Sequence, residues 1–420
     1  LAPNGSLIRD PFPGNIIPLN RLDPVALKIQ NLIPLPQTSG LTNNLVPVYT
    51  GPTRTNFPSI KGDQQIGSKW KASVYWTESS NIRPYSPGTG GAEGYPDTIT
   101  AGRGNYIGSH AERINLEATL RPTLLLHIGA GYQHLDFQDK SPVTNFDSFK
   151  ELGLRGQTLV RNFPQLTGLN TASYGGIGNL GPNAQSISEM VKPTFNNSMT
   201  YVTGNHTYKA GSELRFEGYP LLSFQSAKGN YVFSANQTGL PSTQGQNLGG
   251  GATGFPYASF LLGLVNNGSI GDVTKSRGGK HQFGMYVQDT WKVTRKFTLD
   301  YGLRWDYSSY SKENYGRGPD FSPTTPNPTV GGRVGAAIYE GSLPGRCQCT
   351  FASNYPYAIG PRMGLAYQIT PKTVLRAGWG LVYTGTPVSN LASNAVSSTP
   401  FSASSPFASV MSLKDGSPLT

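Results

Sequence analysis

The stretch that decides the fold lies at residues 281–310 and reads HQFGMYVQDTWKVTRKFTLDYGLRWDYSSY. Apolar side chains occupy every second position on either side of a short break at residues 294–296, with Asp289 as the one exception. The apolar positions are Phe283, Met285, Val287, Trp291, Val293, Phe297, Leu299, Tyr301, Leu303, Trp305 and Tyr307. Alternation on both sides of a tight turn predicts a β-hairpin with one apolar and one polar face.

The same pattern recurs along the chain, at residues 57–77, 114–132, 197–216 and 363–383. Very short turns join the strands of each pair, such as Arg121-Pro122-Thr123 and Thr370-Pro371-Lys372. Between the hairpins run stretches rich in Gly, Pro, Ser, Asn and Thr, at residues 80–110, 139–195, 220–279 and 311–360. The sequence therefore predicts short turns at one end of the strands and unusually long loops at the other.

Strand length separates a membrane barrel from a soluble sheet. Strands of soluble proteins average about 5 to 6 residues, whereas the alternation here persists for longer. The ten steps from Phe297 to Tyr307 span roughly 33 Å, or about 25 Å along the membrane normal at a tilt near 40°, which equals the apolar band of an outer-membrane barrel. The expected fold class is all-β, an antiparallel transmembrane β-barrel with about ten to twelve strands of a larger barrel. A soluble sandwich with an aromatic core is the alternative.

Two sets of residues follow from the barrel interpretation. The apolar face is expected to meet lipid, with aromatic girdles formed by Trp291, Phe297, Trp305, Tyr307, Trp379 and Tyr383. The polar face is expected to line a wet lumen, with the candidates Lys71, Arg113, Arg215, Arg304, Asp306 and Arg376. These charges can serve as scaffolding through cross-strand pairs, or the basic excess can guide anionic ligands or lipid phosphates.

Composition and charge exclude several classes of protein. The chain contains 52 Gly and 33 Pro and is only 14% charged, which disfavours a helical bundle or an α/β enzyme. It holds no run of about 20 apolar residues, so transmembrane helices are excluded. The 34 basic residues exceed the 23 acidic ones by 11, but they are spread along the chain and not concentrated in a stripe, which argues against nucleic-acid binding.

Three segments are expected. Residues 1–56 form a loop segment with a short helix at 23–33, which Asp23 caps. Residues 57–384 form the barrel hairpins with their long loops, and residues 385–420 form a Ser/Pro-rich loop segment. A second short helix is expected at residues 257–264, inside a long loop.

No motif argues for catalysis, a metal or a cofactor. Residues 176–181 match the dinucleotide fingerprint by letter, but no strand precedes them and Pro182 follows, so we interpret them as a flexible loop. The five histidines are scattered, and His127 and His134 are expected on opposite faces of one strand. The acidic pair of Asp136 and Asp139 is expected to be solvated and not to hold calcium.

The two cysteines, Cys347 and Cys349, are one residue apart. We expect them on a long extracellular loop, on the side opposite the short turns. A bond between them would close a small strained ring, so free thiols or partners outside this chain are expected.

Several stretches of the sequence resemble a known family. They are FPGNIIP at 12–18, RLDPVA at 21–26, IKGD at 60–63, HTYKAG at 206–211, ASFLLG at 258–263, YVQDTWKV at 286–293, LDYGLRW at 299–305 and GPRMGLA at 360–366. Their order and spacing are similar to those of TonB-dependent outer-membrane receptors, in the Oar-like branch whose N-terminus carries a carboxypeptidase-regulatory-like domain. The resemblance implies a barrel of about 22 strands, filled by an N-terminal plug and energised from the inner membrane.

The sequence departs from that family in what it lacks. It shows no plug, no energy-coupling box, no regulatory-like domain and no terminal strand ending in an aromatic residue. Half a barrel cannot close, so we expect a fragment of a longer chain or a piece that other chains complete.

The expected function is that of the barrel portion of a receptor or transporter for nutrient uptake in the outer membrane of a Gram-negative bacterium. Expected partners are outer-membrane lipids, an unidentified nutrient ligand and, by resemblance alone, an inner-membrane energy-coupling protein. Specificity is expected in the long loops, which hold unpatterned Tyr, Asn and Gly. The alternative is a structural or adhesive barrel assembly whose loops bind neighbouring chains.

Overall fold

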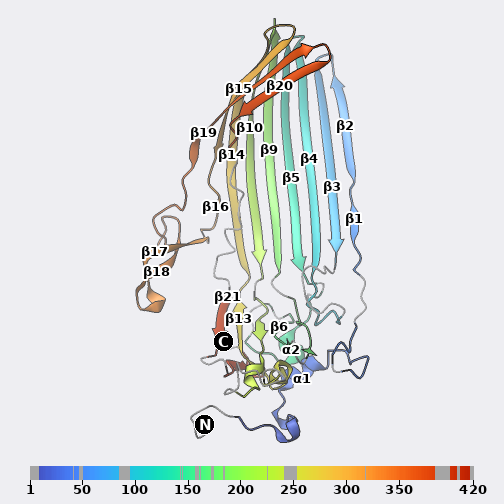
Figure 1. Cartoon of the computed structure of the whole chain (residues 1–420), viewed down its shortest axis with the longest axis vertical. Coiled ribbons are helices and arrows are strands. Elements are labelled where there is room, and N and C mark those ends of the chain that lie inside the picture. The colour runs from blue at the N-terminus through green and yellow to red at the C-terminus, as the bar shows by residue number, and fades with distance from the viewer. Residues whose placement is uncertain are drawn as a thin grey trace.

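A computed structural model of the chain describes residues 9–40, 42–46, 51–84, 95–141, 143, 145–156, 160, 162–171, 175–182, 185–224, 226–240, 253–316, 318–383, 398–403 and 407–416. Its elements fall into two parts (Figure 1). Long strands lie side by side in one large sheet, and short helices and strands gather beyond one end of it.

Twelve of the described strands form the large sheet, and each runs antiparallel to its neighbours. Their bounds are β1 (Arg54–Asn56), β2 (Ser59–Ile66), β3 (Trp70–Arg83), β4 (Gly104–Arg121), β5 (Leu124–Lys140), β9 (Ser186–Thr203), β10 (His206–Ser223), β14 (Thr274–Lys292), β15 (Phe297–Ser308), β16 (Lys312–Glu313), β19 (Tyr355–Thr370) and β20 (Thr373–Gly380). The order in space is β1, β3, β4, β5, β9, β10, β14, β15, β19 and β20, while β2 pairs with β3 and β16 with β14. Sequence neighbours are therefore spatial neighbours, and the described sheet is open at β1 and β2 on one side and at β20 on the other.

All five predicted hairpins are confirmed. The pairs are β2 with β3, β4 with β5, β9 with β10, β14 with β15, and β19 with β20. In the turn between β14 and β15, the hydroxyl of Thr294 accepts hydrogen bonds from the backbone amides of Lys296 and Phe297. The short turns lie together at the end of the sheet that is uppermost in Figure 1.

The strands are longer than the sequence predicts. β4, β9 and β10 each extend over 18 residues and β14 over 19. The four predicted loops are therefore too long, because the connections between long strands run only over residues 84–103, 141–185, 224–273 and 309–354. Alternation marks a strand only where its two faces meet different surroundings, and the strands continue beyond that part without a regular pattern, as in residues 274–282 of β14, which read TKSRGGKHQ.

Beyond the loop-side ends of the strands, segments far apart in the sequence pack into what we call the loop module. It comprises the described parts of residues 9–40, 95–103, 145–182, 226–271 and 398–416. Residues 9–40 of the predicted first segment therefore belong to it, whereas residues 54–56 form β1 of the large sheet, and residues 385–397 of the predicted last segment lie outside the described residues. Its core consists of Val25, Ala26, Ile29, Ile99, Leu152, Leu154, Phe163, Leu166, Leu169, Leu180, Tyr231, Phe233, Phe260, Val265, Ile270, Phe401, Met411 and Leu413. The long connections thus bury apolar surface together instead of extending separately into solvent.

Short elements frame this core. They are η1 (Pro13–Asn15), η2 (Leu19–Arg21), α1 (Pro24–Gln30), α2 (Ser148–Leu152), β6 (Gln165–Thr167), β7 (Asn170–Thr171), β8 (Gly175–Gly176), β11 (Asn230–Val232), η4 (Ala235–Gln237), α3 (Pro256–Leu261), β12 (Leu264–Val265), β13 (Asn267–Gly271), β21 (Ser398–Ser402) and β22 (Met411–Ser412). They include a small sheet in the order β21, β13, β11, β6. Segments from both ends of the chain therefore share one packed unit.

Both predicted helices are present but shorter than expected. Asp23 caps α1 by accepting from the amides of Val25 and Ala26 at 2.8 and 3.2 Å, as predicted. In α3 the ring of Phe260 is fully buried in the loop module. α2 was not predicted; Asp147 caps it and Gly153 ends it in the left-handed conformation. No helix in the described part of the chain is long and apolar enough to cross a membrane.

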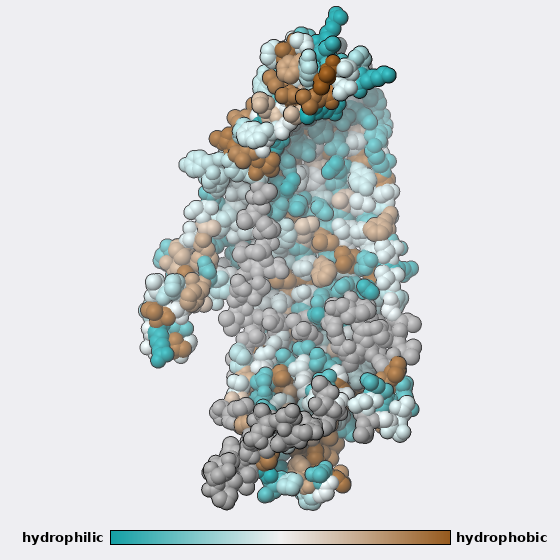
Figure 2. Space-filling model, in the orientation of Figure 1, coloured by the Kyte–Doolittle hydropathy of each residue, from teal (hydrophilic) through white to brown (hydrophobic). Residues whose placement is uncertain are grey.

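A separate hairpin projects sideways from the sheet. It consists of β17 (Pro319–Asn327) and β18 (Arg333–Tyr339), joined by η6 (Pro328–Val330). Phe321 and Val334 on it are 68% and 69% exposed, and apolar residues are visible on its surface (Figure 2). This hairpin presents apolar side chains that the other described residues do not cover.

Candidate functional site

The strand register places all six predicted lumenal residues on one face of the sheet, which we call the polar face. One row of cross-strand partners on it runs Lys71, Glu117, His127, Ser198, Gly211, Tyr286, Arg304 and Gly360. Arg113, Arg215, Asp306 and Arg376 stand an even number of positions from this row, and side chains two apart along a strand share a face. The opposite face, which carries Val287, Leu303 and the other alternating apolar residues, we call the apolar face.

Ion pairs hold several of these side chains in place. Nζ of Lys71 lies 3.1 Å from Oδ1 of Asp63 on the neighbouring strand. Nε of Arg304 donates to both carboxylate oxygens of Asp306, at 2.8 and 2.9 Å, two positions along the same strand. Arg215 pairs with Glu213 at the same spacing. Mixed charges on this face therefore support each other, both across and along strands.

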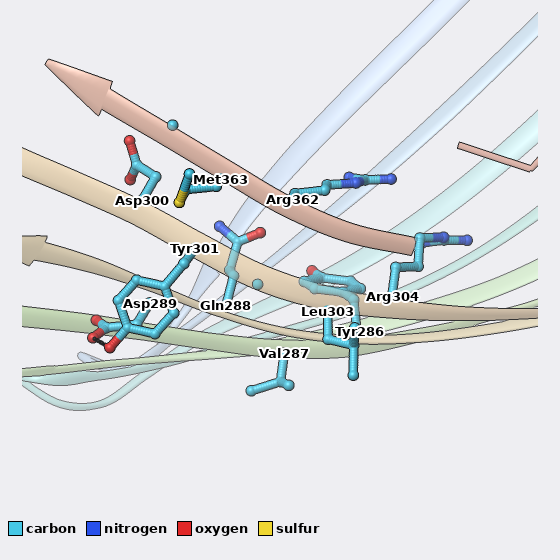
Figure 3. Close-up of a pocket in the computed structure, with 12 residues that line it drawn as sticks. Tyr286, Val287, Gln288, Asp289, Asp300, Tyr301, Leu303, Arg304, Arg362 and Met363 are labelled. Atoms are coloured by element: carbon cyan, nitrogen blue, oxygen red, sulfur yellow. Dashed lines mark hydrogen bonds between the residues drawn. The ribbon is translucent and has the colours of Figure 1, made fainter. Parts of the chain in front are cut away.

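The densest group, which we call the charged strip, consists of Glu213, Arg215, Arg304, Asp306 and Arg362. These residues line a hollow of about 480 Å³ on the polar face. Arg304 and Arg362 come from β15 and β19 and point the same way, while Val287 points in another direction (Figure 3). The strip contains three arginines and two acids, so one positive charge remains available to an anionic group.

Sequence reasoning missed Arg362. It follows Gly360 and Pro361, and the alternation used to find the strand was taken to begin only at Met363. The structure extends β19 back to Tyr355, which puts Arg362 beside Gly302 of β15. Extending the alternation of this hairpin backwards by one residue would have found it. In the register of β19 with β20, Arg362 and Arg376 lie on the same face.

Glycines make room for the large side chains of the polar face. A Cβ at Gly284 of β14 would overlap the guanidinium of Arg304 and come within 2.8 Å of Oδ1 of Asp306. A Cβ at Gly211 of β10 would lie 2.8 Å from the hydroxyl of Tyr286. The long side chains therefore lie flat across neighbouring strands, which is possible only where those strands carry no side chain.

The six predicted girdle residues lie on or beside the apolar face. Trp291 stacks on His206, with ring centroids 5.3 Å apart, and Phe297 meets Tyr367 edge to face at 6.3 Å. Trp305 contacts both Phe283 and Tyr307. Trp379 is 64% exposed, and Tyr383 follows the end of β20 with its ring 6.3 Å from that of Tyr355. None of the six belongs to the buried core of the loop module.

Asp289, the exception in the alternation, is held on the apolar face by two partners. Its Oδ2 lies 2.7 Å from Nδ1 of His206 and accepts the hydroxyl of Tyr301 at 2.9 Å. The side chain is buried to 4% exposure beneath the aromatic residues. A carboxylate is tolerated on an apolar face only when it is paired in this way.

The histidines were expected to be scattered and the acidic pair to be solvated, but some of these side chains have close partners in the structure. His127 and His134 do lie on opposite faces, as predicted, but His134 faces His110 of β4 with ring centroids 5.0 Å apart. Asp136 and Asp139 stand on opposite faces of β5, and Asp139 is not merely solvated, because Arg103 pairs with it at 2.8 Å. No group of metal-ligating side chains is found among the described residues.

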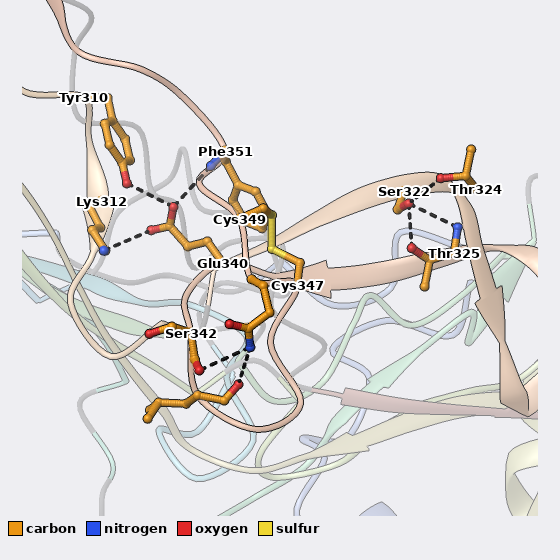
Figure 4. Close-up of a disulfide and its surroundings, with 12 residues drawn as sticks. Tyr310, Lys312, Ser322, Thr324, Thr325, Glu340, Ser342, Cys347, Cys349 and Phe351 are labelled. Carbon is orange, nitrogen blue, oxygen red and sulfur yellow. Dashed lines mark hydrogen bonds and ion pairs between the residues drawn. A yellow bond between two sulfur atoms is a disulfide. The ribbon is translucent and has the colours of Figure 1, made fainter.

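The expectation for the cysteines is half right. They lie on the loop side, as predicted, in the connection that precedes β19. They are bonded to each other (Figure 4), so the prediction of free thiols or external partners is wrong. The reason is that Gln348 between them adopts a positive φ of 57°, which brings the two Cα atoms to 5.1 Å, within the usual range for a disulfide. Gln348 is held there by a hydrogen bond from its amide to the carbonyl of Gly341.

Residues 176–181 were expected to form a flexible loop, but the structure shows them packed. Leu180 is fully buried and exchanges backbone hydrogen bonds of 2.8 and 3.0 Å with Leu166. Gly181 has a φ of +69°, and a Cβ there would overlap the carbonyl of Pro164. The glycines serve close packing in the core of the loop module, which single-sequence motif reading cannot distinguish from mobility.

A buried polar cluster joins the loop module to the strand ends. Nζ of Lys228 donates to Oε1 of Gln185 at 2.9 Å, and Arg103 pairs with Asp139. Burial, together with the nearby positive charge of Arg103, lowers the pKa of the Lys228 ammonium to about 7. Sequence reasoning did not bring these residues together, because Arg103, Gln185 and Lys228 come from three different connections and Asp139 from the end of β5.

A family model described as Outer membrane beta barrel domain matches residues 1–419. The chain therefore belongs to this outer-membrane β-barrel family, which confirms the expected fold class and the expected location in the outer membrane. No curated protein matches the sequence.

The chain is similar in structure to several solved outer-membrane proteins, among them the following three. The transporter YddB from Escherichia coli is 13% identical, with a TM-score of 0.40 over 78% of this chain and 39% of that one. The ferric yersiniabactin uptake receptor FyuA from Yersinia pestis is 8% identical, with a TM-score of 0.38 over 76% and 36%. The closed form of the ferric-catecholate import receptor Fiu from E. coli K12 is 11% identical, with a TM-score of 0.39 over 80% and 46%. This chain spans less than half the length of each.

Proposed function

We propose that this chain is the barrel portion of an outer-membrane receptor or transporter that takes up a nutrient ligand and is energised through an inner-membrane coupling complex. The polar face would line the lumen and the apolar face would meet lipid. The observation that carries the proposal is the combination of a charged strip on the polar face with a packed loop module at the loop-side end of the same strands. The lining and the mouth of an uptake path would then belong to one continuous structure.

The charge of the strip supports an anionic ligand. Arg304 is neutralised by Asp306 and Arg215 by Glu213, whereas Arg362 is exposed and has no ion-pair partner among the described residues. A ligand carboxylate or phosphate could accept bidentate hydrogen bonds from such a guanidinium. The role of the strip in uptake, like the assignment of the two faces, is part of the proposal.

Uptake by cells that carry the full-length protein tests this. We expect uptake of radiolabelled ferric citrate, an anionic chelate, to exceed that of neutral maltoheptaose and to stop when a protonophore collapses the inner-membrane potential. The variant Arg362→Gln should lower ferric citrate uptake severalfold, while Gln288→Asn, a neutral change on the same face, should leave it unchanged. Uptake that is insensitive to the protonophore would contradict energised transport.

A structural or adhesive role is the second candidate, and the projecting hairpin favours it. Phe321 and Val334 are exposed on the β17–β18 hairpin, where they are available to a neighbouring chain. The double variant Phe321→Ser/Val334→Ser separates the two roles. Loss of surface attachment or assembly with uptake unchanged would favour the adhesive role, and the reverse result would favour the receptor.

A further inference from the structure

On β10 and β14 the apolar face ends in a sharp change of residue type. Phe216 and His281 are cross-strand partners, and their rings meet edge to face at 5.0 Å. The next pair on this face toward the loop side is Gly218 with Gly279, and the pair after that is Pro220 with Arg277. Apolar side chains, then bare backbone, then a cation follow one another along the same two strands.

The bare backbone forms the floor of a hollow of about 500 Å³. A Cβ at Gly218 would meet no atom nearer than Nη2 of Arg277, at 3.7 Å, so the guanidinium of Arg277 leans over this floor. Val191 and Pro193 of β9 and Phe216 of β10 line the hollow on its apolar side. The hollow is therefore amphipathic, with an apolar wall and a cationic wall.

Two cations belong to the cationic wall. Arg277 is exposed, and Lys312 of β16 stands beside Gly279 with its side chain 52% exposed. Nζ of Lys312 lies 3.9 Å from Oε1 of Glu340, at the long limit of an ion pair. Both cations therefore remain accessible to a ligand in the hollow.

The nearby acids are occupied by other donors. The two carboxylate oxygens of Glu313 accept from the backbone amides of Arg277 and Tyr315, both at 2.9 Å. Glu340 accepts the hydroxyl of Tyr310 at 3.2 Å. Glu217, which also lines the hollow, lies between two lysines, Lys192 at 3.5 Å and Lys280 at 3.7 Å. Among the residues that the structure describes, these acids therefore leave the guanidinium of Arg277 without a carboxylate partner.

The position along the strand sets the environment of the hollow. From Trp291, near the short turn, to Gly279 is twelve steps of β14, or about 30 Å along the membrane normal at a tilt near 40°. The apolar band of an outer-membrane barrel is about 25 Å tall. The hollow therefore lies at the level of the lipid head groups on the loop side.

We propose that this hollow binds a phosphorylated glycolipid of the outer leaflet. An acyl chain would pack against Val191, Pro193 and Phe216, and the phosphate would lie between Arg277 and Lys312. A lipid is favoured over a free anion because the apolar wall is continuous with the lipid-facing face of the sheet. This lipid site rests on the proposed assignment of the apolar face to lipid but not on uptake, since it lies on the opposite face from the charged strip.

The test is native mass spectrometry of the full-length protein extracted from outer membranes in mild detergent. We expect phosphorylated glycolipid to remain bound to the wild type. Its apparent affinity should fall roughly fivefold for Arg277→Gln or Lys312→Gln and roughly thirtyfold for both. Gly218→Val, which fills the floor but keeps both charges, should also reduce binding. Lys275→Gln, an equal loss of charge farther along β14, should not.

Three results would overturn the proposal. The first is glycolipid retention that is the same in the double variant and in Lys275→Gln. The second is displacement of the bound glycolipid by millimolar inorganic phosphate, which would make this a simple anion site. The third needs no variant: a wild-type unfolding midpoint that is identical in phosphatidylcholine vesicles with and without the glycolipid. That measurement decides the question even where the double variant fails to fold.

Discussion

The backbone amide of Lys414 donates a 3.1 Å hydrogen bond to Oδ2 of Asp23, 391 residues away in the sequence. The same oxygen accepts the hydroxyl of Ser412 at 3.1 Å, while Oδ1 caps α1. The amide of Asp23 in turn donates to the carbonyl of Leu261 at the end of α3. Asp23 thus ties α1, α3 and the segment at β22 into the loop module: its carboxylate reaches α1, Ser412 and Lys414, and its amide reaches α3.

Replacing Asp23 with alanine should loosen the loop module without unfolding the sheet. The change removes a helix cap and leaves the hydroxyl of Ser412 and the amide of Lys414 unsatisfied, a loss on the order of 3 kcal/mol. We expect proteolysis of the loops in intact cells to accelerate strongly, while the barrel keeps its heat-dependent mobility in electrophoresis. Asp23→Asn keeps the cap and should be intermediate; equal protection of Asp23→Ala and wild type would contradict this role.

Lys228 should make the loop module more stable at alkaline pH. Its folded pKa of about 7 lies below its unfolded value of 10.5, so between these values the unfolded state binds more protons and stability rises with pH. The slope is at most about 1.4 kcal/mol per pH unit and disappears below pH 7. Protease resistance of the full-length protein at pH 7.5 and 9.5 measures it, in a window below tyrosine ionisation.

The matched variant for that experiment is Lys228→Met, which keeps the length of the side chain and removes the charge. It should be as resistant at pH 7.5 as at pH 9.5. A wild-type protein that is less resistant at pH 9.5 than at pH 7.5 would show that the sign is wrong.

Adjacent residues of β14 test which face meets lipid. Val287 and Gln288 are both exposed and stand on opposite faces. Val287→Lys should cost about 2 to 4 kcal/mol of folding free energy in a bilayer, as expected for a lysine near the midplane. Gln288→Lys should cost little, and folding titrations in lipid vesicles compare the two. The opposite ranking would reverse the assignment of the faces.

The Cys347–Cys349 bond should be visible by peptide mass. The tryptic peptide of residues 347–362 from protein alkylated without reductant should be two hydrogens lighter than the reduced peptide and carry no alkyl group. Because the bond closes only a local loop, Cys347→Ser/Cys349→Ser should leave folding of the barrel unchanged. Alkylation of either cysteine in unreduced, denatured protein would contradict the bond.

The sequence by itself determined the hairpins, their turns and the two faces of each strand. Alternation is a local property: in residues 281–310 it depends only on side chains that are close together in the sequence, so no long-range information is needed. The cap of α1 by Asp23 is equally local. The same reasoning began the last hairpin only at residue 363, because Pro361 precedes it. It therefore missed Arg362.

Only the tertiary structure decided where the strands end, how the connections pack and which distant groups meet. Toward the loop side the alternation breaks down, as in residues 274–282 of β14, where both faces are polar, so β4, β9 and β14 were predicted too short. The loop module draws its core from segments such as those of Ile29, Leu180 and Met411, and its apolar residues are buried only by one another. Burial of that kind depends on contacts between connections hundreds of residues apart, which no local pattern encodes.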